Sequence, residues 1–133
     1  MTITYKPQLL LNSVTGTSTY VQSTAYDEAS RIKQRVLGAN KVTSNFGYYP
    51  WNTPNGAGRL QTASHSNSSQ TLQAFNYTYS ALGNILSMTV TDPQYNEAHT
   101  YGYDEINRLL SAAVTGGPAN YSESMAFSSY LDK

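Results

Sequence analysis

A short motif recurs along the chain and constrains its fold more than any other feature. In its clearest copy, YGYDEINRLLSAAV, two tyrosines stand one residue apart, and a polar turn and an Arg-Leu pair follow. FNYTYSALGNILSMTV aligns with this copy, so that Tyr79 matches Tyr103 and Gly83 matches Asn107. The full copies cover residues 24–36, 46–63, 75–90 and 101–114. Self-similarity at a fixed spacing predicts a repeat architecture rather than a single closed core.

The two ends of the chain look like partial copies. Tyr5 precedes Tyr26 by 21 residues, and Phe127 follows Tyr103 by 24 residues. We therefore treat residues 1–133 as a single repeat domain with a period of about 21–31 residues. Its predicted divisions are a partial repeat at 1–22, repeats at about 23–45, 46–74, 75–98 and 99–122, and a truncated repeat at 123–133.

The motif predicts a β-hairpin. Tyr101 and Tyr103 alternate with polar or small residues, which places both rings on one face of a strand. The turn that follows requires a residue tolerant of positive φ, and Gly58, Gly83 and Asn107 meet that need. Ser30 is the least suitable residue at this position, so we expect a modified turn there. A two-stranded hairpin is marginal in water on its own, so neighbouring copies must stack and bury one another.

The pattern Y-x-Y-D-x-x-G-R-L, or G-N-L, resembles the YD repeat, also called the RHS repeat, of bacterial toxin-shell and teneurin-like proteins. The resemblance covers essentially the whole chain. Ser30 and Asn107 stand where that family usually has Gly, and Ser80 replaces the Asp. The resemblance implies an all-β fold of stacked antiparallel hairpins that form a curved or spiralling sheet. The self-cleaving signature of some toxin shells is not matched by Asp92-Pro93-Gln94-Tyr95, so that activity is not expected.

Composition excludes several classes of function. Charged residues make up 12% of the chain and sum to zero net charge, against about 25% in typical proteins. Nothing here attracts nucleic acid, and no apolar run has the ~20 residues of a membrane span. There is no cysteine, which excludes disulfides and thiolate chemistry. The N-terminal residues show no signal peptide.

Catalytic and metal-binding patterns are also weak. His65 and His99 lie in different repeats without ligand spacing. The only dense acidic group spans a hairpin connection and the next strand, without a separation that would define a carboxylate pair. No G-x-S-x-G element or phosphate-binding glycine loop occurs. We therefore expect no enzymatic activity, no catalytic residues, no metal site and no cofactor.

The expected function is structural. We expect an aromatic ladder through the sheet, and exposed strand edges that pair with another chain, because unpaired edges act as templates. Head-to-tail pairing would build a homopolymeric filament, sheath or shell outside the cell or at its surface. The ladder residues are Tyr26, Tyr48, Tyr79, Tyr103 and Phe127. The predicted assembly contacts are Ile3, Tyr5, Met125 and Phe127.

Two alternatives remain open. The chain could be an excised fragment of a large toxin-encapsulating shell, or a cell-surface adhesion or carbohydrate-binding module. The second full copy of the motif supports the latter, because YYPWNTPNGAG adds six residues between Tyr48 and Arg59. Tyr49 and Trp51 in this insertion could form a stacking platform for a glycan. The competing interpretation is that Trp51 folds back onto the strand face as a plug.

Overall fold

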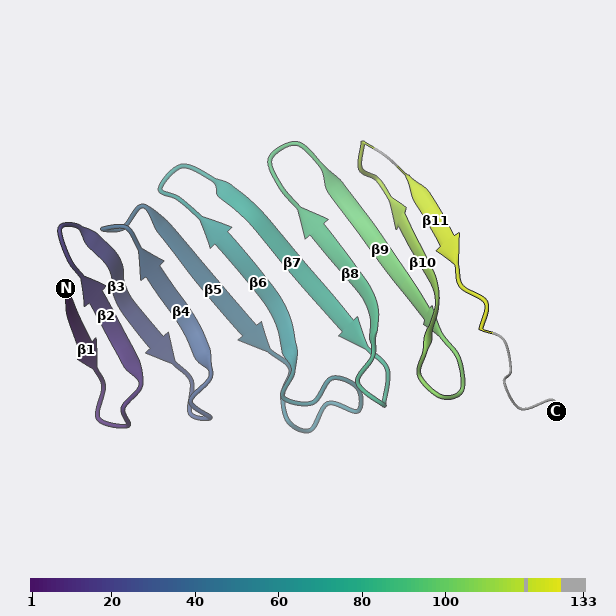
Figure 1. Ribbon diagram of the computed structural model, residues 1–133, viewed down its shortest axis with the longest axis horizontal. Coiled ribbons are helices and arrows are strands. Elements are labelled where there is room, and N and C mark those ends of the chain that lie inside the picture. The colour runs from purple at the N-terminus through teal and green to yellow at the C-terminus, as the bar shows by residue number, and fades with distance from the viewer. Residues whose placement is uncertain (119, 128–133) are drawn as a thin grey trace.

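The computed structural model describes residues 1–118 and 120–127, which form one open antiparallel sheet (Figure 1). Its 11 strands lie side by side in sequence order. The strands are β1 (Thr2–Tyr5), β2 (Leu11–Thr15), β3 (Thr19–Tyr26), β4 (Ile32–Leu37), β5 (Val42–Tyr48), β6 (Leu60–Ser66), β7 (Thr71–Tyr79), β8 (Ile85–Thr91), β9 (Asn96–Tyr103), β10 (Leu109–Thr115) and β11 (Tyr121–Ser124). The predicted all-β class of curved, antiparallel hairpins is confirmed.

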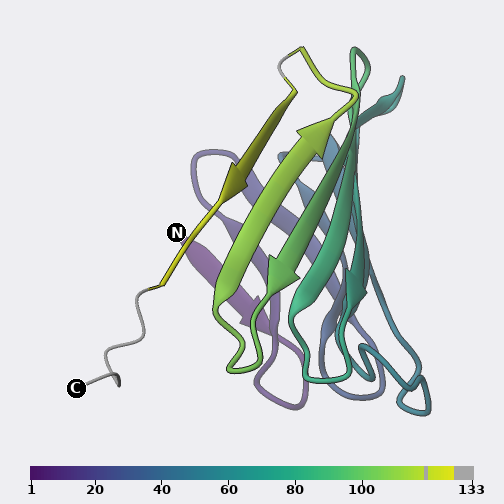
Figure 2. The same ribbon diagram turned by 90° about the vertical axis from the view of Figure 1, so that its right-hand side faces the viewer.

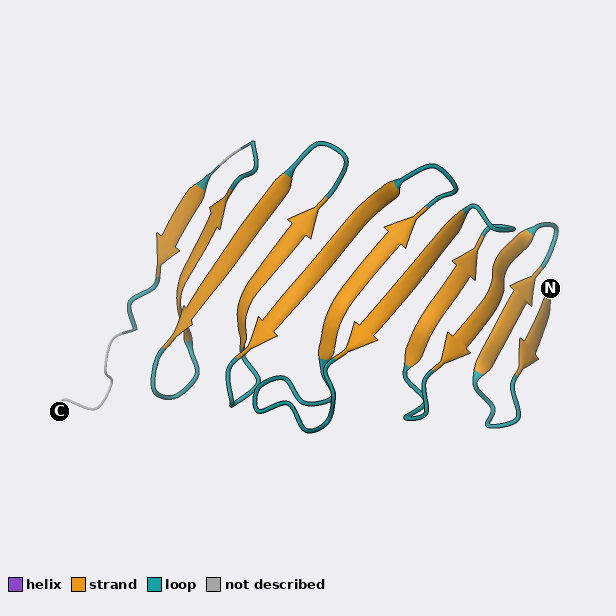
Figure 3. Ribbon diagram, turned by 180° about the vertical axis from the view of Figure 1, so that it is seen from behind, coloured by secondary structure: helices purple, strands orange, loops and turns teal. Residues whose placement is uncertain are grey.

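The sheet is a single curved layer (Figure 2). Strands and loops make up the described part of the chain, which holds no helix that could span a membrane (Figure 3). Among the described residues only Thr24, Ser44, Gly56, Ala63 and Val114 are buried. The sheet therefore has no central core of the two-layered kind, and its stability depends on contacts between neighbouring strands.

The two faces of the sheet differ in chemistry because side chains alternate along each strand. On the aromatic face, one row of directly opposed residues runs Tyr77, Met88, His99, Val114 and Tyr121. On the small-residue face, the neighbouring row runs Gly47, Thr62, Asn76, Thr89 and Ala98. Small hydroxyl and methyl groups thus cover one face, and most of the large rings gather on the other.

The turns that close β3–β4 and β9–β10 share one hydrogen-bond pattern. The Asn107 N–H donates to the carbonyl of Asp104 at 3.0 Å, and the Asp104 N–H donates to the carbonyl of Arg108 at 2.9 Å. Asn107 has φ 66°. This is a type I turn followed by a left-handed residue, a common hairpin connection. The predicted turn positions Gly58 and Gly83 are also left-handed, with φ 68° and 92°.

The expectation of a modified turn at Ser30 is wrong. Ser30 has φ 62° and bonds to the carbonyl of Asp27 at 3.0 Å, as Asn107 does with Asp104. The Asp27 carboxylate accepts hydrogen bonds from the backbone of the turn, and these bonds hold the turn in shape without glycine. Leu9 occupies the same position in the first hairpin, with φ 59°. The turn geometry therefore survives residues that disfavour it.

Candidate functional site

Successive hairpins are joined by tyrosine hydroxyl groups at the turn end of the sheet. The last residue of each of β3, β5, β7 and β9 is a tyrosine. Its Oη donates a hydrogen bond to the carbonyl of the first residue of the preceding strand. The pairs are Tyr26–Leu11 at 2.8 Å, Tyr48–Ile32 at 2.8 Å, Tyr79–Leu60 at 2.7 Å and Tyr103–Ile85 at 2.9 Å. Each predicted ladder tyrosine therefore ties its own hairpin to the one before it.

Arginines from the turns cover the next aromatic ring along the sheet. The Arg31 guanidinium lies 4.1 Å from the ring centre of Tyr48, and that of Arg108 lies 4.2 Å from the ring centre of Phe127. Phe127 has no hydroxyl group, so at its position the cation–π contact is not joined by a tyrosine-to-carbonyl bond. Arg59 covers Tyr79 more loosely, at 5.8 Å.

The stacking arginines are functional residues that sequence reasoning missed. The motif contains an Arg-Leu pair, but this pair does not by itself indicate what the arginine side chain contacts. In the turn between β7 and β8, Asn84 stands at the arginine position, and its Nδ2 donates to Asn107 Oδ1 at 2.8 Å. A regular spacing between this position and the next aromatic residue was the available signal.

Aspartates hold two of these arginines in place. Asp27 Oδ2 lies 2.6 Å from Arg31 Nη2, and Asp104 Oδ2 lies 2.6 Å from Arg108 Nε. Desolvation raises the pKa of each carboxyl group, but hydrogen bonds and the positive charge of its arginine outweigh it. The pKa of both groups therefore lies below its ordinary value. For Tyr48 and Tyr79, burial raises the pKa of the hydroxyl, which keeps it a neutral donor.

The insertion between Tyr48 and Arg59 keeps the closure of the shorter turns. The Tyr49 N–H donates to the carbonyl of Arg59 at 2.9 Å, as Asp104 does with Arg108. Tyr49 Oη donates to the carbonyl of Tyr77 at 2.8 Å, and its ring packs edge-on against Tyr79. Tyr49 is thus occupied by packing within the sheet and does not offer a free ring to a ligand.

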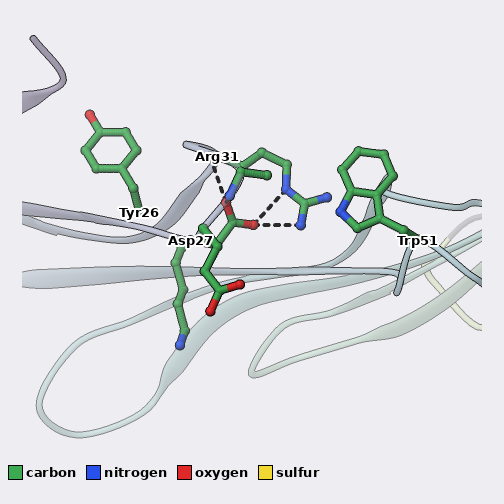
Figure 4. A pocket seen from close by; sticks show the side chains of 7 residues that line it. Tyr26, Asp27, Arg31 and Trp51 are labelled. Carbon is green, nitrogen blue, oxygen red and sulfur yellow. Dashed lines mark hydrogen bonds and ion pairs between the residues drawn. The ribbon is translucent and has the colours of Figure 1, made fainter. Parts of the chain in front are cut away.

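Trp51 lies on the opposite flank of the insertion and remains open. It is 67% exposed, and the Arg31 guanidinium lies 5.0 Å from its ring centre. The ring therefore does not form the expected plug on the strand face. Trp51 lines a shallow hollow of about 610 Å³, and Figure 4 shows the side chains around it. The lining residues are Tyr26, Asp27, Glu28, Ala29, Arg31, Lys33 and Trp51. This hollow offers one open ring and both signs of charge.

The predicted assembly contacts at the two edges of the sheet differ in how exposed they are and in how they are bound to it. Ile3 and Tyr5 of β1 are 41% and 58% exposed. Phe127 is 44% exposed but carries Arg108 on its ring. The Met125 N–H donates inward, to the carbonyl of Leu110 at 2.7 Å. The geometry leaves the side chains of Ile3 and Tyr5 exposed, whereas the Met125 backbone and the Phe127 ring are bound to the sheet.

The histidines lie on the aromatic face in separate surroundings. His65 Nδ1 bonds Ser44 Oγ at 2.8 Å, and His99 Nε2 lies 3.2 Å from Glu97 Oε2. Within residues 1–118 and 120–127, no group of three His, Cys, Asp or Glu side chains could hold a metal ion.

Solved structures share this arrangement of strands. A mutant Tc holotoxin pore of Photorhabdus luminescens matches 92% of the chain with 18% identity and a TM-score of 0.56. A TcdB2–TccC3–Cdc42 complex matches 92% of the chain with 17% identity and a TM-score of 0.56. The sheet has an RHS-like fold. The chain spans only 8% of the length of each of these matched chains, so the likeness concerns the fold alone. No family model matches the chain, and no curated protein matches it.

Proposed function

We propose that this RHS-like sheet is a structural segment in the wall of a larger β-sheet shell. The observation that carries the proposal is the single layer of strands in sequence order with two free edges. Within the described residues, β1 pairs only with β2 and β11 only with β10. Each edge therefore offers backbone N–H and C=O groups that another antiparallel strand would satisfy.

The contacts between hairpins support a wall rather than a hinged strip. Each junction from β2–β3 to β8–β9 combines backbone pairing with one tyrosine-to-carbonyl bond. A ring held by both its hydroxyl group and a neighbouring guanidinium resists rotation of one hairpin against the next. Repeats coupled in this way gain stability from each added neighbour.

Strand direction favours continuation of this sheet over head-to-tail stacking of copies. All neighbouring strands are antiparallel, so β1 and β11 run in the same direction. A second copy that was translated along the sheet would set its β1 parallel to β11. A copy that was turned over would restore antiparallel pairing but would place its small-residue face beside the aromatic face. A filament of identical copies, the other assembly that we expected, must accept one of these mismatches.

Hydrogen exchange can test the wall proposal. In the isolated chain, we expect the outer amides of β1 and β11 to exchange quickly and those of β6 slowly. In native particles purified from the source, the β1 and β11 peptides should become as protected as β6. Edge amides that still exchange quickly in the native particle would contradict the proposal. Digestion of intact cells by added protease would test the extracellular or cell-surface location that the sequence analysis predicts.

A second candidate function, glycan binding, rests on the open ring of Trp51. Exposed indole rings stack on sugar faces, and Glu28 and Lys33 supply polar groups beside the ring. Titration of the protein with a panel of oligosaccharides, followed by tryptophan fluorescence, would test this directly, because Trp51 is the only tryptophan. Deletion of residues 50–55 leaves Tyr49, Gly56, Ala57, Gly58 and Arg59, which matches the length of the shorter turns.

The controls for glycan binding use the same loop. Trp51→Ala and the deletion should both abolish binding measured by calorimetry, while the circular dichroism spectrum stays unchanged. Tyr49→Phe is the matched control, because it alters a neighbouring aromatic residue that faces the sheet. Binding that survives Trp51→Ala would rule out the hollow as the glycan site.

A further inference from the structure

A row of polar side chains crosses the aromatic face over four strands. Cross-strand register pairs Thr24 of β3 with Arg35 of β4, Arg35 with Ser44 of β5, and Ser44 with His65 of β6. Directly opposed residues point to the same face with Cβ atoms about 5 Å apart. The four side chains therefore form one line, which we call the polar row.

One half of the polar row is satisfied within the protein. Ser44 is 5% exposed, and its Oγ bonds His65 Nδ1 at 2.8 Å. The His65 ring is set edge-on between Phe46 and Phe75, with ring centres 6.3 and 6.4 Å away. No carboxylate of the described residues bonds this imidazole, so the pair is not a catalytic Ser-His arrangement. It forms a fixed, polar end to the row.

The other half of the polar row lacks partners. Thr24 is 1% exposed, and its Oγ1 makes no hydrogen bond among the described residues. Nε of Arg35 is also buried and unpaired there. Arg31 and Arg108, in contrast, are each paired with an aspartate. A buried hydroxyl and a buried guanidinium Nε without acceptors are costly, so their opposed placement indicates a ligand rather than packing.

The charge around this half indicates the sign and kind of ligand. Lys33 lies on the same strand as Arg35, at the irregularity in the pairing of β4 with β3, and adds positive charge to this strand. A guanidinium offers parallel N–H donors that fit a carboxylate, and the Thr24 hydroxyl can donate to the same anion. We propose that Arg35 and Thr24 form a binding site for a carboxylate on the aromatic face. The proposal does not depend on the wall function.

Arginine side-chain NMR would test the site. We would follow the Nε–Hε signals of the four arginines in ¹⁵N-labelled full-length chain during titration with sodium acetate. Sodium chloride at equal ionic strength is the reference. The Arg35 signal should shift and saturate at millimolar acetate, while the signals of Arg31 and Arg108 change little. A linear response that is equal for all four arginines, or equal in chloride, would overturn the proposal.

Variants separate the carboxylate site from general charge effects. Thr24→Val keeps the side-chain volume and should weaken acetate binding roughly fivefold, as expected for one lost hydrogen bond. Arg35→Gln should abolish saturation. Thr89→Val, on the small-residue face, is the matched control and should leave binding unchanged. An unaltered dissociation constant in Thr24→Val, with an unchanged melting temperature, would remove the buried hydroxyl from the site and sink the proposal.

A second titration distinguishes the source of the carboxylate. A blocked Ala-Glu-Ala peptide presents the same group on a polypeptide side chain. Tighter binding of the peptide than of acetate would identify a protein partner that lies against the aromatic face. Equal binding would identify a free carboxylate as the ligand.

Discussion

Tyr103 shows how one residue joins two hairpins. Its ring lies on the aromatic face, and its Oη donates to the carbonyl of Ile85. We expect Tyr103→Phe to lower the free energy of unfolding by about 1 kcal/mol, because one hydrogen bond is lost. Tyr103→Ala removes the ring as well and should cost about 3–5 kcal/mol. Urea denaturation measures both changes.

Tyr95 supplies the control for these variants. It is 41% exposed, and its hydroxyl group makes no hydrogen bond among the described residues. Tyr95→Phe should leave the free energy of unfolding almost unchanged. An equally small effect of Tyr103→Ala would contradict the idea that the tyrosines hold the hairpins together.

Asp104 makes stability depend on pH. Desolvation raises the pKa of this carboxyl group. The hydrogen bonds and the positive charge of Arg108 lower the pKa by more than desolvation raises it, so the folded pKa lies below the unfolded value. The stabilisation is therefore present above the unfolded pKa, near 4, and is lost as the pH falls through the folded pKa. We expect urea midpoints to drop below about pH 4, and to drop less in Asp104→Asn. Parallel pH curves for the two proteins would refute this role.

At the scale of the hairpin, glycine allows close approach between paired strands. A Cβ at Gly102 of β9 would meet Oγ of Ser111, its partner on β10. We expect Gly102→Ala to lower the free energy of unfolding by about 1–3 kcal/mol through overpacking. Ser111→Ala removes the obstructing oxygen, so the double variant should recover most of that loss. Additive effects in the double-mutant cycle would contradict this contact.

The turns show what the sequence could and could not predict. Period-two tyrosines and the Gly or Asn positions were sufficient to predict the hairpins, since both signals are local. Ser30 misled the prediction because its left-handed conformation is supported by Asp27 rather than by its own preference. We expect Ser30→Gly to raise the free energy of unfolding by about 0.5 kcal/mol, because it relieves the left-handed strain at some cost in chain entropy. A melting temperature below that of the unaltered chain would show that Ser30 is unstrained.

Contacts between strands were harder to predict from the sequence than the strands themselves. The stacking of Arg31 on Tyr48 joins different repeats, and the polar row depends on the register of four strands. Thr24, Arg35, Ser44 and His65 have no regular spacing along the chain. Tyr49 and Trp51 were predicted together as a platform, but the insertion turns them to opposite flanks. Such placements are set by pairing partners, which a single sequence does not specify.

For the whole molecule, the decisive property is the common direction of its two edge strands. Antiparallel pairing with both faces preserved requires a two-fold axis normal to the sheet, which brings β1 against β1 or β11 against β11. Thr4 and Ser122 are exposed residues of these strands, and the chain has no cysteine of its own. Thr4→Cys and Ser122→Cys variants therefore each carry one thiol that a short bismaleimide can link.

We expect the isolated chain at high concentration to cross-link like with like. Mass spectrometry of an equimolar mixture of ¹⁵N-labelled Thr4→Cys and unlabelled Ser122→Cys would distinguish the products by mass. Like-with-like pairs would show that the free edges seek antiparallel partners, as a wall continued by further strands requires. Predominant mixed pairs would show that copies join β11 to β1. Head-to-tail filaments would then be the better account, because the sheet would have accepted parallel pairing or a turned-over face at every junction.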